Sequence, residues 1–287
     1  MGLHQICTMI DFPIMSALPQ TIQKMARVPS RRGFTLVELL VVISIIGILI
    51  GMLLPGVQAV REASRRTSCQ SKLHNIGLAI LNFESSHRAF PPGATFETQH
   101  SWGSVILPYL DQRPVFDTIE FEENWSAEVV NSEVAAMDLG IFSCPSSQKL
   151  FPGKTDYCGI SGSWRNAVGM QQSTLNGMLF PVVRPDQQEI RIASVTDGTS
   201  HTLMVSEGVE VLEENNGFWA CGLNCFTHED GGINAVHRPA DEIVSDHPSG
   251  AVGCSCDGSV RFFGNQIDDE IIAALCTRNG GESSDAF

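Results

Sequence analysis

The stretch RRGFTLVELLVVISIIGILIGMLLP, from Arg31 to Pro55, is the most apolar part of the chain. Between Leu36 and Leu54 about 19 residues run with few polar side chains, close to the ~20 that an α-helix needs to cross a bilayer. One charged residue, Glu38, lies at the start of this run. A charge at the centre of a membrane costs roughly 2.5–3.5 kcal/mol on insertion scales, so an intramembrane acid indicates a function. The stretch therefore predicts one transmembrane helix whose acid meets a positive partner.

Composition favours one membrane segment followed by one folded domain. The chain has 287 residues, 43% of them hydrophobic, and no internal repeat is evident. Residues 89–287 contain 9 Lys and Arg against 28 Asp and Glu, a net charge of −19. Because nucleic-acid binding needs a basic face that meets phosphates, we expect no nucleic-acid partner. Solubility is the simplest role of this charge, and cation binding is the alternative.

A secretory signal peptide is the competing interpretation of the apolar run. Such a peptide has an apolar core of about 7–15 residues followed by a small-residue cleavage site. Here the run is longer and continues through Pro55 into GVQAVREASRR without a suitable site. Flanking charge does not orient the span, because four basic residues precede it and four follow it.

The segment RRGFTLVELLVVISIIGILIGMLLPGVQAVREASRR, residues 31–66, resembles the N-terminal signal of type IV prepilins and type II secretion pseudopilins. The resemblance implies that a prepilin peptidase/methyltransferase cuts between Gly33 and Phe34 and methylates the new amine of Phe34. It implies that Glu38 pairs with that amine, and that the other partners are pilin-like subunits and the lipid bilayer. It also implies a single pass through the inner membrane, with a cytoplasmic N-terminus and a C-terminal domain in the periplasm or at the cell surface.

The physical chemistry of this pairing agrees with the resemblance. Removal of residues 1–33 leaves a positive α-amine at the end of an apolar helix, where an uncompensated charge is costly. When helices bundle, Glu38 of one subunit can meet the Phe34 amine of another, so that each charge offsets the desolvation of the other. A glutamate that extends to the membrane interface is the alternative. Because the leader is long for this class, we expect translation to begin at Met25, with Met1 as the alternative start.

Periodicity predicts that the apolar helix continues beyond the membrane. Apolar residues recur at steps of three and four from Val57 to Phe83, so we expect a helix from Phe34 to about Glu84, kinked or loosened at Pro55. The later sequence predicts short strands and turns without strand–helix alternation, which favours antiparallel pairing. We therefore expect an α+β, pilin-like fold, in which this helix packs on a domain of mainly antiparallel β-sheet with short helices.

Four parts of the chain follow from these expectations. Residues 1–33 are the cleaved cytoplasmic leader, and residues 34–55 are the transmembrane helix. Residues 56–88 are its amphipathic continuation, and residues 89–287 are the globular α+β domain.

The segment HPSGAVGCSCDGSVRFFGNQID carries the clearest local signal of that domain. Asp257-Gly258 lies between two apolar runs, a pattern that favours a two-residue hairpin turn of type I′. The resulting register brings His247 opposite Asp268. His247 and Asp257 would lie about 30 Å apart at ~3.3 Å per residue, so we interpret His247 as an end-of-strand hydrogen bonder and Asp257 as a turn former.

The same segment resembles a second family. His247, nine residues and then Asp257-Gly258 are similar to the H-x9-D-G domain associated with prepilin-type processing. With WGSVILPYLDQ, FSCPSS, TDGTSHTLMVSE and LCTRNGGE, residues 31–282 resemble the large bacterial family called domain of unknown function 1559. The biochemical role of that family is unassigned, although a solute-binding label has been attached to it.

Nine cysteines raise the question of disulfides or a metal site. The C-x3-C and C-x-C spacings in the C-terminal part differ from the C-x2-C pairs of common zinc sites, so we favour one or two disulfides on the non-cytoplasmic side. The candidates, whose pairing the sequence leaves open, are Cys144, Cys158, Cys221, Cys225, Cys254, Cys256 and Cys276. We expect Cys69, on the predicted helix, to be free.

The stretch HEDGGINAVHRPADEIVSDH is rich in histidine and carboxylate side chains. Calcium prefers clustered oxygen ligands on loops, and some major pseudopilins bind it in a C-terminal loop, so the first candidates are Glu229, Asp230, Asp241 and Asp246. The EF-hand spacing is absent, so a solvated acidic loop is the simpler interpretation and we expect no cofactor.

An enzyme is not expected. Ser200-His201 beside Asp197 has the residue types of a hydrolase, but no G-x-S-x-G elbow surrounds these residues. Two functions therefore remain: a structural subunit of a pilus or pseudopilus, and a membrane-anchored extracytoplasmic domain that binds a solute or a cation. Glu38 separates them, because an assembly subunit needs this acid and an anchor does not.

Overall fold

The computed structural model describes residues 33–127, 130–164, 175–182, 187, 189–208, 217–229, 231–235 and 243–281. The chain divides into two compact units, Met1–Met52 and Leu53–Phe287. Helix α1 (Leu36–His87) begins in the first unit and ends in the second. Its 52 residues confirm the long N-terminal helix that the sequence predicts.

A reciprocal pair of hydrogen bonds sets the start of α1. Thr35 Oγ1 accepts from the backbone N–H of Glu38 (3.2 Å), and the Glu38 carboxylate accepts from the backbone N–H of Thr35 (2.9 Å). This arrangement is a capping box, which satisfies two backbone donors near the helix end. The helix therefore begins at Leu36, two residues later than predicted.

The first part of α1 exposes its apolar side chains. Ile48 and Met52, for example, keep 59% and 75% of their surface. Within the described residues, α1 is the one helix long and apolar enough to cross a membrane, judged by length and composition. The helix continues through Pro55, although this residue offers no backbone N–H to the residue one turn earlier.

The second unit contains a five-stranded mixed sheet of order β3-β1-β2-β4-β5. Its strands are β1 (Tyr157–Ser163), β2 (Leu203–Glu207), β3 (Cys225–His228), β4 (Gly250–Ser255) and β5 (Val260–Gly264). β1 pairs with β3 in parallel, and the other neighbours pair antiparallel. The prediction of an α+β fold with a mainly antiparallel sheet is therefore confirmed.

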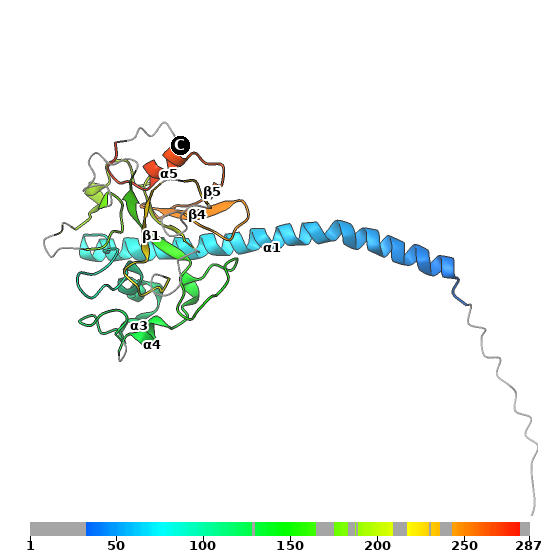
Figure 1. Cartoon of the computed structure of the whole chain (residues 1–287), viewed down its shortest axis with the longest axis horizontal. Coiled ribbons are helices and arrows are strands. Elements are labelled where there is room, and N and C mark those ends of the chain that lie inside the picture. The colour runs from blue at the N-terminus through cyan, green and yellow to red at the C-terminus, as the bar shows by residue number, and fades with distance from the viewer. Residues whose placement is uncertain are drawn as a thin grey trace, which may run out of the picture. The chain divides into compact units, whose positions relative to one another are not determined.

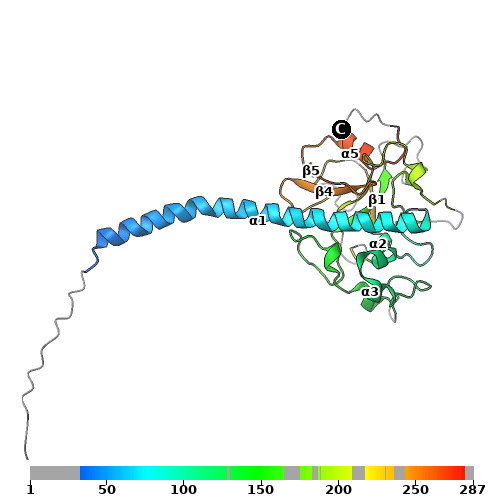
Figure 2. The ribbon, with the colours of Figure 1, turned by 180° about the vertical axis from the view of Figure 1, so that it is seen from behind.

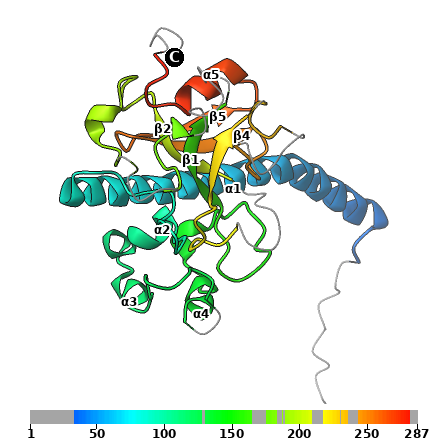
Figure 3. The same ribbon diagram turned by 60° about the vertical axis from the view of Figure 1, so that its left-hand side comes forward.

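Both faces of this sheet are buried. One face packs on the part of α1 that carries Leu73, Ile76 and Ile80, which have no exposed surface. The other face packs on α5 (Asp269–Leu275) through Ile272 and Leu275 (Figure 3). Figures 1 and 2 show α3 on the side of α1 that faces away from β4 and β5. The last part of α1 thus lies at the centre of the second unit, which explains why its apolar stripe becomes core from Cys69 onward.

Short helices cover the rest of this core. They are α2 (Trp102–Val105), η1 (Leu107–Leu110), α3 (Arg113–Phe116), α4 (Ser132–Ala135), η2 (Gly140–Phe142) and η4 (Ile192–Ser194). Trp102 and Trp219 are among the largest fully buried side chains, and both pack against Phe142.

The β4–β5 hairpin forms where Asp257-Gly258 predicts it, but its register is one residue different. Ser255 N–H donates to Ser259 O (2.9 Å), and Gly258 N–H donates to Ser255 O (2.9 Å) with Gly258 at φ 82°. This is a three-residue loop whose last residue is left-handed, rather than a type I′ turn. The ladder ends at Gly250 opposite Gly264, so the predicted pairing of His247 with Asp268 is wrong.

Gly77 allows α1 to approach this hairpin closely. A Cβ atom at Gly77 would lie 2.5 Å from Cys254 Sγ and 3.6 Å from Gly258 Cα. We expect Gly77→Ala to lower the free energy of unfolding by about 1–3 kcal/mol, the usual cost of overpacking. Urea denaturation of the full chain in detergent, followed by tryptophan fluorescence, measures this loss.

Gly56→Ala on the same helix is the matched control. A Cβ atom there meets nothing within 4 Å, and alanine favours a helix by up to ~1 kcal/mol over glycine. Its urea midpoint should equal or exceed that of the wild type. A Gly77→Ala midpoint as high as that of Gly56→Ala would contradict the close packing of α1 on the hairpin.

Candidate functional site

The residues predicted to be processed lie just before α1. Gly33 and Phe34 are outside the helix and exposed, with Phe34 retaining 69% of its side-chain surface. A Cβ atom at Gly33 would meet nothing within 4 Å, so the fold around Gly33 does not itself require glycine. An exposed segment outside regular structure is the kind that a peptidase can reach. Cleavage between these residues and methylation of Phe34 stay predictions.

Glu38 already has a local partner within the single chain. Its carboxylate accepts hydrogen bonds from the backbone N–H and from Oγ1 of Thr35, at 2.9 and 2.7 Å. The partial positive charge of a helix N-terminus further stabilises an acid at this position. The predicted amine of Phe34 would arise one residue before Thr35, beside the same capping box.

The second unit contains a buried polar cluster that the sequence does not indicate. It consists of Glu62 and Cys69 on α1, Cys144 after η2, Glu207 at the end of β2 and His247 before β4. We call these five residues the His247 cluster. All except Glu62 are at most 3% exposed. They meet because the second part of α1 packs on the sheet face beside β2 and β4.

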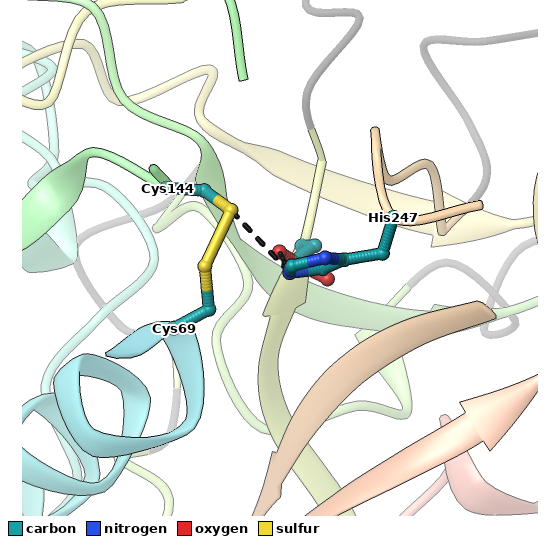
Figure 4. Close-up of side chains that lie close together, drawn as sticks. Cys69, Cys144 and His247 are labelled. Atoms are coloured by element: carbon teal, nitrogen blue, oxygen red, sulfur yellow. Dashed lines mark hydrogen bonds and ion pairs between the residues drawn. A yellow bond between two sulfur atoms is a disulfide. The ribbon is translucent and has the colours of Figure 1, made fainter. Parts of the chain in front are cut away.

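The ring of His247 has a carboxylate near each nitrogen. Nδ1 is hydrogen-bonded to Glu62 Oε1, and Ser146 Oγ lies 3.3 Å from the same nitrogen. On the other side, Nε2 lies 3.5 Å from Glu207 Oε1 and 3.6 Å from Cys144 Sγ. Figure 4 shows the ring directed at the sulfur pair of Cys69 and Cys144. His247, which the sequence predicts to be an end-of-strand hydrogen bonder, is therefore buried between α1 and the sheet and has contacts on both sides of its ring.

The two carboxylates of the cluster differ in their surroundings. Burial raises the pKa of Glu207 to about 6, although its carboxylate accepts from Val252 N–H and Ser245 Oγ, both at 2.8 Å. Burial also opposes ionisation of Glu62, but hydrogen bonds from His247 and Arg65 outweigh it and lower the pKa of Glu62. Glu62 is therefore the more acidic of the two groups that face His247.

A buried ion pair holds the chain beside Cys144. Asp156 accepts from the backbone N–H of Cys144 (2.7 Å) and pairs with Lys154, and both side chains are at most 5% exposed. Lys72 on α1 donates to Ser143 O (2.7 Å). These noncovalent contacts also help to position Cys144 relative to α1.

Cys69 and Cys144 form a disulfide, with a Cα–Cα distance of 5.5 Å. The prediction that Cys69 is free is wrong, because the helix turn that carries it faces the segment after η2. Within the described residues, the other candidates Cys158, Cys221, Cys225, Cys254 and Cys256 are thiols, and Cys276 is buried. Burial raises the pKa of Cys158 and of Cys254 to about 12, which makes these thiols poor nucleophiles.

The predicted acidic loop is only partly described. Asp230 and Asp241 lie outside the described residues, whereas Glu229 follows β3 and Asp246 is exposed beside His247. In the described part of the chain, the one group of three or more side chains close enough to share a metal ion contains neither Glu229 nor Asp246. A calcium site in this loop stays a prediction.

The residues with hydrolase character are not arranged as a triad. Ser200 Oγ lies 3.3 Å from His201 Nδ1, but the Asp197 carboxylate accepts from the backbone N–H groups of Gly280 and Gly281, at 2.6 and 3.0 Å. Asp197 thus fastens the C-terminal turn to the loop before β2.

A Ser–His–Asp arrangement occurs elsewhere, at residues that sequence reasoning missed. Ser163 Oγ lies 3.3 Å from His228 Nδ1, and His228 Nε2 lies 3.1 Å from Asp269 Oδ1. Ser163 and His228 have no exposed surface. The three residues connect β1, β3 and α5.

A family model of the prokaryotic N-terminal methylation motif matches residues 29–54, which include the exposed segment before α1 and the first part of that helix. This motif indicates a type IV pilin-like prepilin subunit, and it implies processing by prepilin peptidase and assembly with other pilins. A second family model, described as protein of unknown function (DUF1559), matches residues 58–270, and the chain belongs to this family. No curated protein and no solved structure matches the chain.

Proposed function

We propose that the chain is a processed, prepilin-like subunit of a pilus or a pseudopilus, with a structural rather than a catalytic role. The observation that carries this proposal is the methylation motif at residues 29–54, which lies on a helix whose first part exposes its apolar side chains. Water does not favour such a surface, so lipid or the helices of other subunits must cover it. In either environment the Glu38 carboxylate needs a positive partner, and the amine of a neighbouring subunit supplies one.

The topology is part of the proposal. Residues 1–33 are a cytoplasmic leader, residues 34–55 span the inner membrane, and residues 56–88 with residues 89–287 lie in the periplasm or at the cell surface. The disulfide between Cys69 and Cys144 supports this orientation, because disulfides persist in oxidising compartments outside the cytosol.

A second candidate function is an anchored domain that binds a solute or a cation outside the cytoplasm. The observation that favours it is the His247 cluster, in which sulfur, imidazole and carboxylate groups meet in the interior of the second unit. In this alternative the apolar helix is only an anchor, and Glu38 has no role in a filament.

Mass spectrometry of the protein isolated from membranes tests the processing step. We expect the mature chain to begin at Phe34 with one methyl group on its α-amine, because the amine can neutralise Glu38 only after the leader is removed. The Gly33→Leu variant is the control: its new side chain meets open space, so the fold should persist while the leader is retained. A wild-type chain that keeps residues 31–33 would contradict the proposal.

A further inference from the structure

Four side chains of the His247 cluster are arranged as the ligands of one metal ion. Cys69, Cys144, Glu207 and His247 each offer an atom, and these atoms all lie within 4.8 Å of one another. The four come from α1, the segment after η2, the end of β2 and the segment before β4, and all are buried. The four residues lie far apart in the sequence, so only the packing of the folded chain brings them together.

The two distances from His247 Nε2 agree with tetrahedral coordination, whereas the two sulfurs are bonded to each other and would have to separate first. Zinc bonds of about 2.0 Å to nitrogen and 2.3 Å to sulfur place neighbouring ligand atoms about 3.3–3.8 Å apart. His247 Nε2 lies 3.6 Å from Cys144 Sγ and 3.5 Å from Glu207 Oε1, within this range. Two sulfurs, one imidazole and one carboxylate form a ligand set that favours Zn²⁺ over harder cations.

One ligand atom has no hydrogen-bond donor. Glu207 Oε1 is buried and accepts no hydrogen bond from the residues that the structure describes. The other oxygen of the same carboxylate accepts from Ser245 Oγ and Val252 N–H, which fixes its direction. A buried carboxylate oxygen without a donor is costly, and a cation between it and His247 would remove that cost.

The surrounding contacts resemble those of an outer shell around a metal. Glu62 binds His247 at Nδ1, so that Nε2 can present its lone pair to a cation, and Arg65 holds Glu62 in turn. Such a carboxylate–histidine pair orients the imidazole in many zinc sites. Asp156 similarly holds the backbone of Cys144 (2.7 Å).

A surface groove borders the cluster at Glu62. Its lining also includes Arg65, Asp246 and Pro248, but none of the four proposed ligands. Glu62 therefore lines this groove and at the same time binds His247.

We propose that the reduced chain, in which Cys69 and Cys144 are thiols, binds one divalent cation of the zinc type through Cys69, Cys144, Glu207 and His247. The disulfide and the metal site exclude each other, because both use the same two sulfurs. A newly made chain has its thiols free before any oxidation. The cation would then join α1 to the segment after η2, as the disulfide does in the oxidised chain, and also to the end of β2 and the segment before β4.

A phosphine reductant converts the disulfide of Cys69 and Cys144 into two thiols. The S–S bond breaks, the two hydrogens of a water molecule pass to the two sulfurs, and the oxygen of that water passes to phosphorus. Binding of the cation then displaces the two thiol protons. Thiol–disulfide exchange with a small-molecule disulfide re-forms the Cys69–Cys144 bond: the S–S bond of that reagent breaks, it takes up two protons and leaves as two thiols, and the cation is released.

Titration of the full chain in detergent with Co²⁺ tests the proposal. In the phosphine-reduced protein we expect one Co²⁺ per chain, thiolate-to-cobalt absorption in the near ultraviolet, and displacement by Zn²⁺. The oxidised protein should show no such absorption. Glu207→Gln and His247→Ala should each weaken binding at least about ten-fold, and Glu62→Gln about 10- to 100-fold, the range for outer-shell partners.

Cys158→Ala is the matched control, because it removes a buried thiol outside the cluster and should bind Co²⁺ as the wild type does. Near-ultraviolet circular dichroism of each metal-free variant shows whether it folds. If His247→Ala does not fold, Glu62→Gln decides, and unchanged affinity in that variant overturns the proposal. The proposal is also overturned if Cys69→Ala keeps the thiolate-to-cobalt absorption while Cys158→Ala loses it. These outcomes are independent of processing at Gly33, so they do not depend on the proposed pilin role.

Discussion

Replacement of Glu38 by Ala is expected to abolish incorporation of the chain into filaments while insertion and processing continue normally. After the proposed cleavage, the amine of Phe34 would carry a positive charge at the end of an apolar helix, and Glu38 is the acid nearest to it in sequence. Removing one partner of a desolvated ion pair costs about 3–5 kcal/mol. A loss of this size weakens each contact between subunits by more than about 100-fold, at ~1.4 kcal/mol for each factor of ten. Immunoblots of sheared filaments, membranes and cytoplasm measure the distribution.

Two further variants separate charge pairing from helix capping, since Glu38 serves the capping box as well. Glu38→Gln keeps an acceptor that suits a capping box but has no charge, so it should fail to assemble as Glu38→Ala does. Thr35→Ala removes the cap at a cost of about 1 kcal/mol but keeps the charge, so it should assemble. Filaments built normally from Glu38→Gln would refute the pairing. Wild-type protein that is processed but never found in filaments would favour the anchored binding domain.

Loss of the disulfide is expected to have the largest effect on stability. Cys69 and Cys144 are separated by 75 residues, and closing a loop of that size contributes about 4 kcal/mol in the chain-entropy model. A typical domain is stable by only about 5–15 kcal/mol, so the double variant Cys69→Ala, Cys144→Ala should lose a large fraction of its free energy of unfolding. The measurement is urea denaturation of the oxidised chain with a chelator present.

Reduction of the wild type provides the control without any substitution. With a chelator present, the reduced wild type should unfold at nearly the same urea concentration as the double variant. Cys158→Ala should respond to reduction as the wild type does, because Cys158 lies outside the disulfide. Equal midpoints for oxidised and reduced wild type would show that the bridge does not stabilise the second unit.

Features set by neighbouring residues could be predicted from the sequence. The apolar run and its acid need only about 20 adjacent residues, and Thr35 and Glu38 are three residues apart, within one helix turn. Leu73 and Ile76 follow the helical period, and both are buried on the face that this period predicts. The hairpin likewise forms at Asp257-Gly258, because its turn chemistry is local.

The hairpin register and the His247 cluster depended on tertiary structure. Asp257-Gly258 is compatible with loops of two or three residues, and the structure contains the three-residue loop, with Gly258 in the left-handed region. Cys69 is bonded to Cys144, which lies 75 residues away in the sequence. His247 is hydrogen-bonded to Glu62, which lies 185 residues away. No spacing along the chain encodes such pairs, since they form only when α1 packs on the sheet and closes those loops. Local chemistry thus specified the long apolar helix and its capping box, whereas long-range packing created the buried group of sulfur, imidazole and carboxylate.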